Sequence, residues 1–118
     1  MKSIAVILAT LLVGSSAYAA DVNNRFFVVG LGSNACKDYT AAPPEKRAYV
    51  DIWLAGYISA LNRVTPDTYH IVGENTPPQA FNAMIAQYCA ANPEDAIATA
   101  IHKIIERVQP NRTRKAPN

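Results

Sequence analysis

The sequence has few of the residues from which metal and redox sites are built. Among its 118 residues are only two histidines and two cysteines, and it contains no C-x-x-C pair. His70 and His102 show no ligand spacing with Cys36 and Cys89, which argues against a metal site. The missing C-x-x-C pair argues against a thiol–disulfide exchange site. We therefore predict no metal and no cofactor.

Enzyme motifs are also scarce. The stretch "GLGSN" at residues 30–34 lacks the lysine and the spacing of a phosphate-binding loop. Ser33 and Ser59 have no adjacent base and no nucleophile-elbow motif. His70 lies in a connector with Glu74 nearby, and functional residues often lie in connectors. A small hydrolase built on that pair stays open as a minor alternative, but we predict that the protein is not an enzyme.

His102 follows Ile101 in a helical pattern, with Glu106 four residues later. This spacing predicts a modest surface interaction between the two side chains.

The numbers of basic and acidic side chains are nearly equal. The chain has 11 basic and nine acidic side chains, and three of the basic ones, Arg112, Arg114 and Lys115, crowd the end of the sequence. No broad basic face indicates a nucleic-acid partner. Prolines and charges favour disorder in residues 110–118. We therefore predict a basic disordered tail there.

A long apolar run occurs only near the N-terminus. Lys2 precedes the apolar residues 4–13, and Ala17 and Ala19 supply small side chains at positions −3 and −1 of a cleavage site. This pattern is typical of a secretory signal peptide. The run is too short to span the ~30 Å of a bilayer core, and no second apolar run follows. We predict cleavage after Ala19, no membrane span thereafter, and a periplasmic or secreted protein.

The two cysteines allow one intramolecular pairing. Export favours a disulfide between Cys36 and Cys89. That bond closes a loop of roughly 53 residues, which the chain-entropy formula converts to about 4 kcal/mol. This is a large share of a typical total stability of ~5–15 kcal/mol. The disulfide is therefore predicted to be a structural staple.

The remaining pattern is helical. A long helix over residues 45–62 contains Gly56, which costs ~1 kcal/mol relative to alanine and would let another element approach beside Trp53. A short helix, capped by Ser33 or Asn34, carries Cys36. The apolar positions of the long helix recur at steps of three and four: Val50, Trp53, Leu54, Tyr57, Ile58 and Leu61.

Two further helices follow in the second half of the chain. Residues 76–79, "TPPQ", fit a capping box that starts a helix ending near Cys89. Residues 92–95, "NPED", place a capping side chain, a proline and two carboxylates at the start of the last helix. Pro110 ends that helix.

These elements predict a mostly all-α fold, a small orthogonal helical bundle stapled by one disulfide. Residues 25–31, "RFFVVGL", are rich in β-forming residues and predict one short N-terminal strand. We divide the chain into a signal peptide (1–19), an extended lead-in (20–35), a helical domain (36–109) and a basic tail (110–118).

Tyrosine and tryptophan make up six of the nine aromatic residues that follow the signal peptide. Such side chains suit surfaces with one apolar and one polar side. Where they are exposed, they are natural anchors for a protein partner. The candidate partner-binding residues are Trp53, Tyr57 and Tyr49.

Three stretches carry a family resemblance: "ACKDY", "YVDIWLAGYISALN" and "TPPQAFNAMIAQYCAANPEDAIATAI". From about Cys36 to Val108 the chain resembles the small periplasmic HdeA/HdeB-type proteins. Its layout is also similar to that of the Tai-type immunity proteins of type VI secretion, which share a Gly-Tyr helix and an Asn-Pro step.

The first resemblance implies a disulfide-linked helical acid-stress chaperone that is dimeric at neutral pH and exposes apolar surface to unfolding clients in acid. Cys36 and Cys89 would match its cysteines. The second implies a homodimer that blocks one toxic enzyme. We therefore expect a protein partner, either unfolding clients or one toxin enzyme. The leading prediction is a periplasmic chaperone, and the alternative is an immunity or inhibitor protein.

Overall fold

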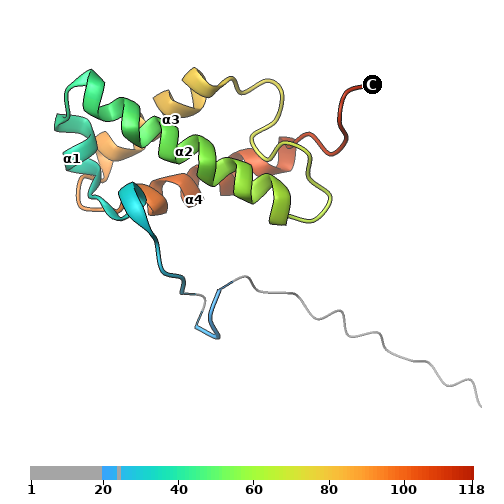
Figure 1. Ribbon diagram of the computed structural model, residues 1–118, viewed down its shortest axis with the longest axis horizontal. Helices are drawn as coiled ribbons and strands as arrows, with labels where there is room; N and C mark the ends of the chain where they lie inside the picture. The colour runs from blue at the N-terminus through green and yellow to red at the C-terminus, as the bar shows by residue number, and fades with distance from the viewer. Residues whose placement is uncertain (1–19, 24) are drawn as a thin grey trace, which may run out of the picture.

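The computed structural model describes residues 20–23 and 25–118, so the predicted signal peptide lies outside the described residues. The described part is mostly helical (Figure 1), which confirms the predicted fold class. The elements are the 3-10 helices η1 (Gly30–Ser33) and η2 (Gln109–Asn111) and the α-helices α1 (Cys36–Ala41), α2 (Pro44–Val64), α3 (Pro78–Ala91) and α4 (Ile97–Val108).

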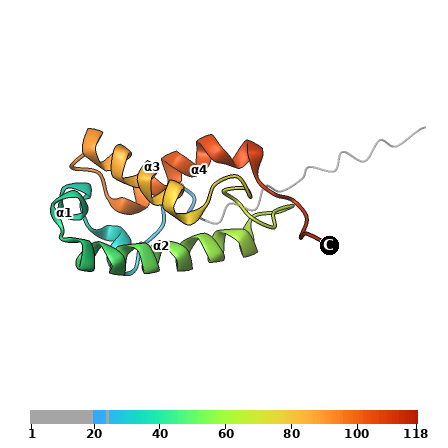
Figure 2. The same ribbon diagram turned by 90° about the horizontal axis from the view of Figure 1, so that it is seen from above.

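The helices form two layers. The long helix α2 lies alone along one side, and α3 and α4 lie along the other (Figure 2). Leu54 of α2, Ile85 of α3 and Ile101 of α4 are buried where the layers meet. Because α2 packs on the core with one face only, its opposite face points away from the protein.

The helix α2 begins at Pro44, the first helical position, where a proline loses no intrahelical hydrogen bond. Its 21 residues extend the predicted range by one residue at the start and two at the end. Differences of this size are expected at helix ends, which fray.

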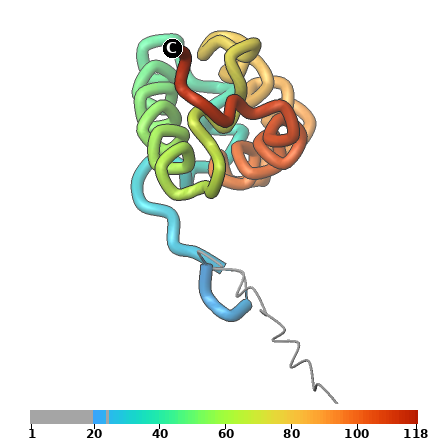
Figure 3. The backbone as a smooth tube through the Cα atoms, turned by 90° about the vertical axis from the view of Figure 1, so that its right-hand side faces the viewer, coloured from blue at the N-terminus to red at the C-terminus, as the bar shows by residue number. Residues whose placement is uncertain are grey.

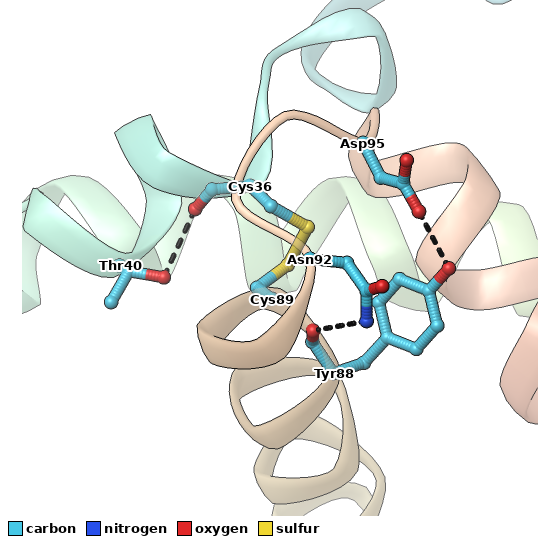
Figure 4. Close-up of a disulfide and its surroundings, with 6 residues drawn as sticks. All are labelled: Cys36, Thr40, Tyr88, Cys89, Asn92 and Asp95. Atoms are coloured by element: carbon cyan, nitrogen blue, oxygen red, sulfur yellow. Dashed lines mark hydrogen bonds between the residues drawn. A yellow bond between two sulfur atoms is a disulfide. The ribbon is translucent and has the colours of Figure 1, made fainter.

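The disulfide joins the first residue of α1 to the last turn of α3. Cys36 and Cys89 are both fully buried, and their Cα atoms lie 4.7 Å apart. Figure 4 shows the bond beside the turn that connects α3 to α4. The staple therefore fastens the start of the helical domain to the α3–α4 pair, as the sequence predicts.

The predicted start of the last helix at residues 92–95 is wrong. This segment is a turn, and α4 begins at Ile97. The carbonyl oxygens of Pro93 and Asp95 accept hydrogen bonds from the N–H groups of Lys37 and Cys36, at 2.9 and 2.8 Å. The turn thus satisfies the free N–H groups of α1, a need that arises only in the folded chain.

The side chains of this turn form hydrogen bonds with α3 and do not cap α4. The side-chain amide of Asn92 donates to the Tyr88 carbonyl over 3.0 Å, at the end of α3. The Tyr88 hydroxyl donates to the Asp95 carboxylate over 2.6 Å (Figure 4). The capping box predicted for α3 is not formed either, because α3 begins at Pro78 after an N-cap at Pro77, with no side-chain cap.

Residues 25–31, where the sequence predicts a strand, form none. Residues 25–29 are extended but unpaired, and η1 follows them directly. A strand needs a neighbouring strand to accept its hydrogen bonds, and the described residues contain only two isolated bridges. The β-forming side chains of this segment are used differently, as described below.

Part of the C-terminal segment, where the sequence predicts a disordered tail, is hydrogen-bonded to the rest of the chain. It folds back over the end of the helices (Figure 3). The Thr113 carbonyl accepts the N–H groups of Tyr69 and His70 at 2.9 and 3.0 Å, and the Thr113 N–H donates to the His70 carbonyl. The side chain of Arg112 lies 3.8 Å from the Asp67 carboxylate. This segment therefore holds the loop between α2 and α3.

Candidate functional site

Trp53 attaches the lead-in to α2. Its Nε1–H donates to the Val29 carbonyl over 3.0 Å. Its ring covers Gly30 and Gly32, so closely that a Cβ atom on Gly32 would lie 2.0 Å from the ring. Only glycine fits at position 32, since real Cβ contacts are much longer. The two glycines thus let the lead-in pass beside Trp53.

A row of rings continues from α2 to α4. The Trp53 and Tyr57 rings stack with centroids 5.1 Å apart. The Tyr57 hydroxyl lies 2.6 Å from His102 Nε2. Phe26 of the lead-in also packs against the His102 ring, at a centroid distance of 4.9 Å. The lead-in, α2 and α4 therefore meet at one aromatic cluster.

Burial in this cluster changes two acid–base equilibria. It lowers the pKa of His102, and the nearby Glu106 carboxylate partly opposes this change. It raises the pKa of Tyr57. The described hydrogen bonds and ion pairs do not include the predicted His102–Glu106 interaction, because Glu106 pairs with Lys103 at 3.3 Å and His102 turns toward Tyr57.

Large apolar side chains lie exposed beside this cluster. Phe27 is 91% exposed, Val29 73%, Ile52 70% and Tyr49 66%. We call these four residues the apolar surface. Three of the four, Phe27, Val29 and Ile52, line an open groove between the lead-in and α2, together with Phe26, Val28, Trp53, Gly56 and Tyr57. Tyr49 lies three residues before Ile52 on α2. Concentrated exposure of apolar side chains marks an interaction site in many soluble proteins.

The three candidate partner-binding residues have different surroundings. Tyr49 is exposed and belongs to the apolar surface. Trp53 and Tyr57 are partly buried and bind Val29 and His102 within the chain. Their binding of a partner stays a prediction. Ile52 was missed, although it lies three residues after Tyr49 and outside the buried stripe, a signal that the sequence contains.

Phe27 and Val29 were missed for a different reason. Their residue types predict a strand, and exposure of unpaired strand residues cannot be read from residue type alone.

The polar candidates are engaged with the backbone. The hydroxyls of Ser33 and Ser59 donate to the carbonyls of Gly30 and Ala55. The Glu74 N–H donates to Thr113 Oγ1, on the same residue that pairs with the His70 backbone. Within residues 20–23 and 25–118, no three His, Cys, Asp or Glu side chains are grouped closely enough to hold a metal ion. No helix in this part of the chain has the length and apolar character needed to cross a membrane.

Comparison with known proteins adds one match. The sequence model that describes the HdeA/HdeB family matches residues 2–99. Neither a curated protein nor a solved structure matches the chain significantly.

Proposed function

Because the chain belongs to the HdeA/HdeB family, we propose that it is an exported, non-enzymatic chaperone that binds proteins unfolded by acid. The observation that carries this proposal is the apolar surface. Phe27, Val29, Tyr49 and Ile52 are the four most exposed large apolar side chains of the described residues after Val22, and three of them line one groove. Unfolding proteins expose apolar segments, to which such a surface binds.

In acid, an apolar contact is better suited to binding a client than a charged contact. At about pH 2–3 carboxylates are protonated, so a client and its chaperone both carry net positive charge and repel each other. Ion pairs between side chains weaken under these conditions, because carboxylates lose their charge. Apolar association does not depend on charge and therefore persists.

The disulfide supports the same role. Thiol–disulfide exchange requires a thiolate, which acid removes. The Cys36–Cys89 bond therefore keeps α1 attached to α3 in acid as well as at neutral pH. A chaperone that must work in acid needs a link of this kind.

The test is the aggregation of an acid-sensitive client protein, measured by light scattering from neutral pH to about pH 2–3, with and without the chain. We expect protection in acid. Replacing Phe27 and Ile52 by serine should weaken it, whereas Val64→Ser, which changes an exposed apolar residue outside the apolar surface, should not. Absence of protection at every pH would exclude the chaperone.

Purification from the periplasm separates the two candidate roles. A chaperone should bring down many clients after acid stress. Co-purification of a single enzyme in stoichiometric amount would favour the inhibitor instead.

A further inference from the structure

The lead-in has the alternation of a strand, although it is paired with none. Residues 25–29 are extended. Phe26 packs on α4 and Val28 is half-buried, whereas Phe27 and Val29 are mostly exposed. Successive side chains of a strand point to opposite faces, so this segment has one face on the protein and one face in solvent. It has the form of an edge strand with no neighbour among the described residues.

The backbone of the lead-in offers hydrogen-bonding groups. Among the described residues, the N–H groups of residues 26–29 and the carbonyls of residues 26–28 form no hydrogen bond. In an extended chain, the N–H and C=O groups of alternate residues point to the same edge. The Val29 carbonyl points to Trp53 of α2, so both backbone groups of Phe27 point to that side as well. One residue of an antiparallel strand matches both groups of Phe27.

The groove between the lead-in and α2 has room for such a strand. Its volume is about 470 Å³, within the range of protein binding sites. Gly56 lines it on the side of α2, and nothing lies within 4 Å of a Cβ atom built on this glycine. A glycine in a helix is unfavourable relative to alanine. The close approach that Gly56 permits is used by no part of the described chain, so it is open to a segment of another protein.

The groove also sets the charge of its occupant. None of the eight residues that line it has a charged side chain. Arg25, which precedes them in the lead-in, is already paired with Asp21 at 3.2 Å. A charged side chain that enters the groove would lose its hydration and find no opposite charge there. An uncharged segment is therefore the complementary occupant.

We propose that the lead-in binds an extended, uncharged segment of another protein by strand addition. The segment lies antiparallel to residues 26–29, pairs with the backbone of Phe27, and packs its side chains against Ile52 and Gly56 of α2. Main-chain hydrogen bonds give the affinity, and the groove selects the side chains. Every residue except proline has the same backbone groups, so this mode of binding accepts many sequences. The proposal rests on the proposed function only for the identity of the partner, an unfolding client.

The test is binding of a short peptide to the exported chain at neutral pH. The probe is a peptide of alternating threonine and valine residues with blocked ends, because these residues form strands and carry no charge. Trp53 is the only tryptophan and lines the groove, so its fluorescence reports binding. N-methylation of the valines blocks one edge of the peptide, and N-methylation of the threonines blocks the other. One methylated peptide should bind at least about tenfold more weakly than the other, because the added strand pairs along one edge.

Two variants of Phe27 test the contribution of the lead-in backbone. Phe27→Ala removes the exposed ring and keeps the N–H group, whereas Phe27→Pro removes both. Proline suits this position, since its restricted φ and its effect on the preceding residue are compatible with an extended chain. Phe27→Pro should therefore bind the unmethylated peptide at least about fivefold more weakly than Phe27→Ala, because it lacks one hydrogen-bond donor.

A variant of Gly56 tests the groove. Gly56→Leu should weaken peptide binding at least about tenfold, because the new side chain occupies the space of the added strand. Ala83→Leu, a change to leucine at an exposed site of α3, is the control and should leave binding unchanged. Circular dichroism verifies that each variant keeps its helices.

Four results would overturn strand addition. They are no binding of the unmethylated peptide, equal binding of the two methylated peptides, equal binding by Phe27→Ala and Phe27→Pro, and full binding by Gly56→Leu. If the chain nevertheless protects an acid-sensitive client, the proposed function stands and clients bind in another mode. If peptide binding depends on the edge but no client is protected, the chaperone is excluded and the lead-in still binds extended segments.

Discussion

The Tyr57 hydroxyl of α2 lies 2.6 Å from Nε2 of His102 on α4, in the aromatic cluster that Phe26 closes from the lead-in. When the imidazole is neutral with its proton on Nδ1, Tyr57 donates to Nε2. Protonation of the ring turns Nε2 into a donor, so Tyr57 must then accept. A single proton thus reverses the hydrogen bond between the two helices.

This pair predicts a loss of stability in weak acid. Burial lowers the pKa of His102 in the folded chain, so the unfolded chain takes up the proton first. Stability is therefore full above the unfolded value of about 6.5 and falls as the pH drops from there toward the lower folded value. The charge of Glu106, four residues later on α4, makes the loss smaller. The urea midpoint should be lower at about pH 5 than at about pH 7.5.

His102→Gln should reduce this pH dependence, because glutamine does not titrate. His70→Gln is the matched control, since His70 contacts Thr113 through its backbone. An equal fall of the midpoint in wild type and His102→Gln would show that other groups cause it.

Gly32→Ala should destabilise the chain by about 1–3 kcal/mol, the cost of overpacking a filled site. Its Cβ would lie 2.0 Å from the Trp53 ring, so the lead-in must shift. Trp53 is the only tryptophan, and its fluorescence therefore reports the shift directly. Gly56→Ala at low protein concentration is the control, because its Cβ meets nothing within 4 Å. Unchanged fluorescence and stability in Gly32→Ala would contradict the packing of the lead-in on α2.

Replacing Cys36 and Cys89 together by alanine should cost about 4 kcal/mol, the loop-closure entropy of the 53-residue separation. The measurement is urea unfolding of the double variant beside the wild-type chain. The wild-type chain in reductant should match the variant, since both lack the bond. A loss below about 1 kcal/mol would mean that the unfolded chain is already constrained in another way.

Truncation after Asn111 should release the loop between α2 and α3. The N–H groups of Tyr69 and His70 bind the Thr113 carbonyl, and Arg114 pairs with Asp67 of the same loop. Hydrogen exchange at these two amides should accelerate in the truncated chain, because they lose their acceptor. Truncation after Lys115 keeps Thr113 and should preserve the protection. If both truncated chains exchange alike, the C-terminal segment does not hold the loop.

The helices could be predicted largely because their evidence is local. The apolar positions of α2 recur at helical spacing, and Pro44 marks a helix start that needs no distant partner. The starts of α3 and α4 were placed wrongly because "TPPQ" and "NPED" have the residue types of capping motifs. The carbonyls of the second motif instead accept hydrogen bonds from the first N–H groups of α1. No local sequence pattern reveals that these distant groups need an acceptor.

The candidate site was predicted only in part for a related reason. Tyr49, Trp53 and Tyr57 lie within nine residues of one helix and have similar residue types. Their exposure differs because the lead-in covers Trp53 and α4 covers Tyr57, while Tyr49 stays 66% exposed among the described residues.

By itself, the sequence determined that this chain is helical and that its two cysteines have only each other as partners in the chain. Periodicity and pairing of this kind depend on residue order alone. Only the tertiary structure decided that the segment "RFFVVGL" packs against Trp53 and does not pair as a strand. It also decided that Thr113 closes a distant loop and that one face of α2 remains exposed. The physical reason is that hydrogen-bond acceptors and covering side chains come from segments far away in the chain, which meet only on folding.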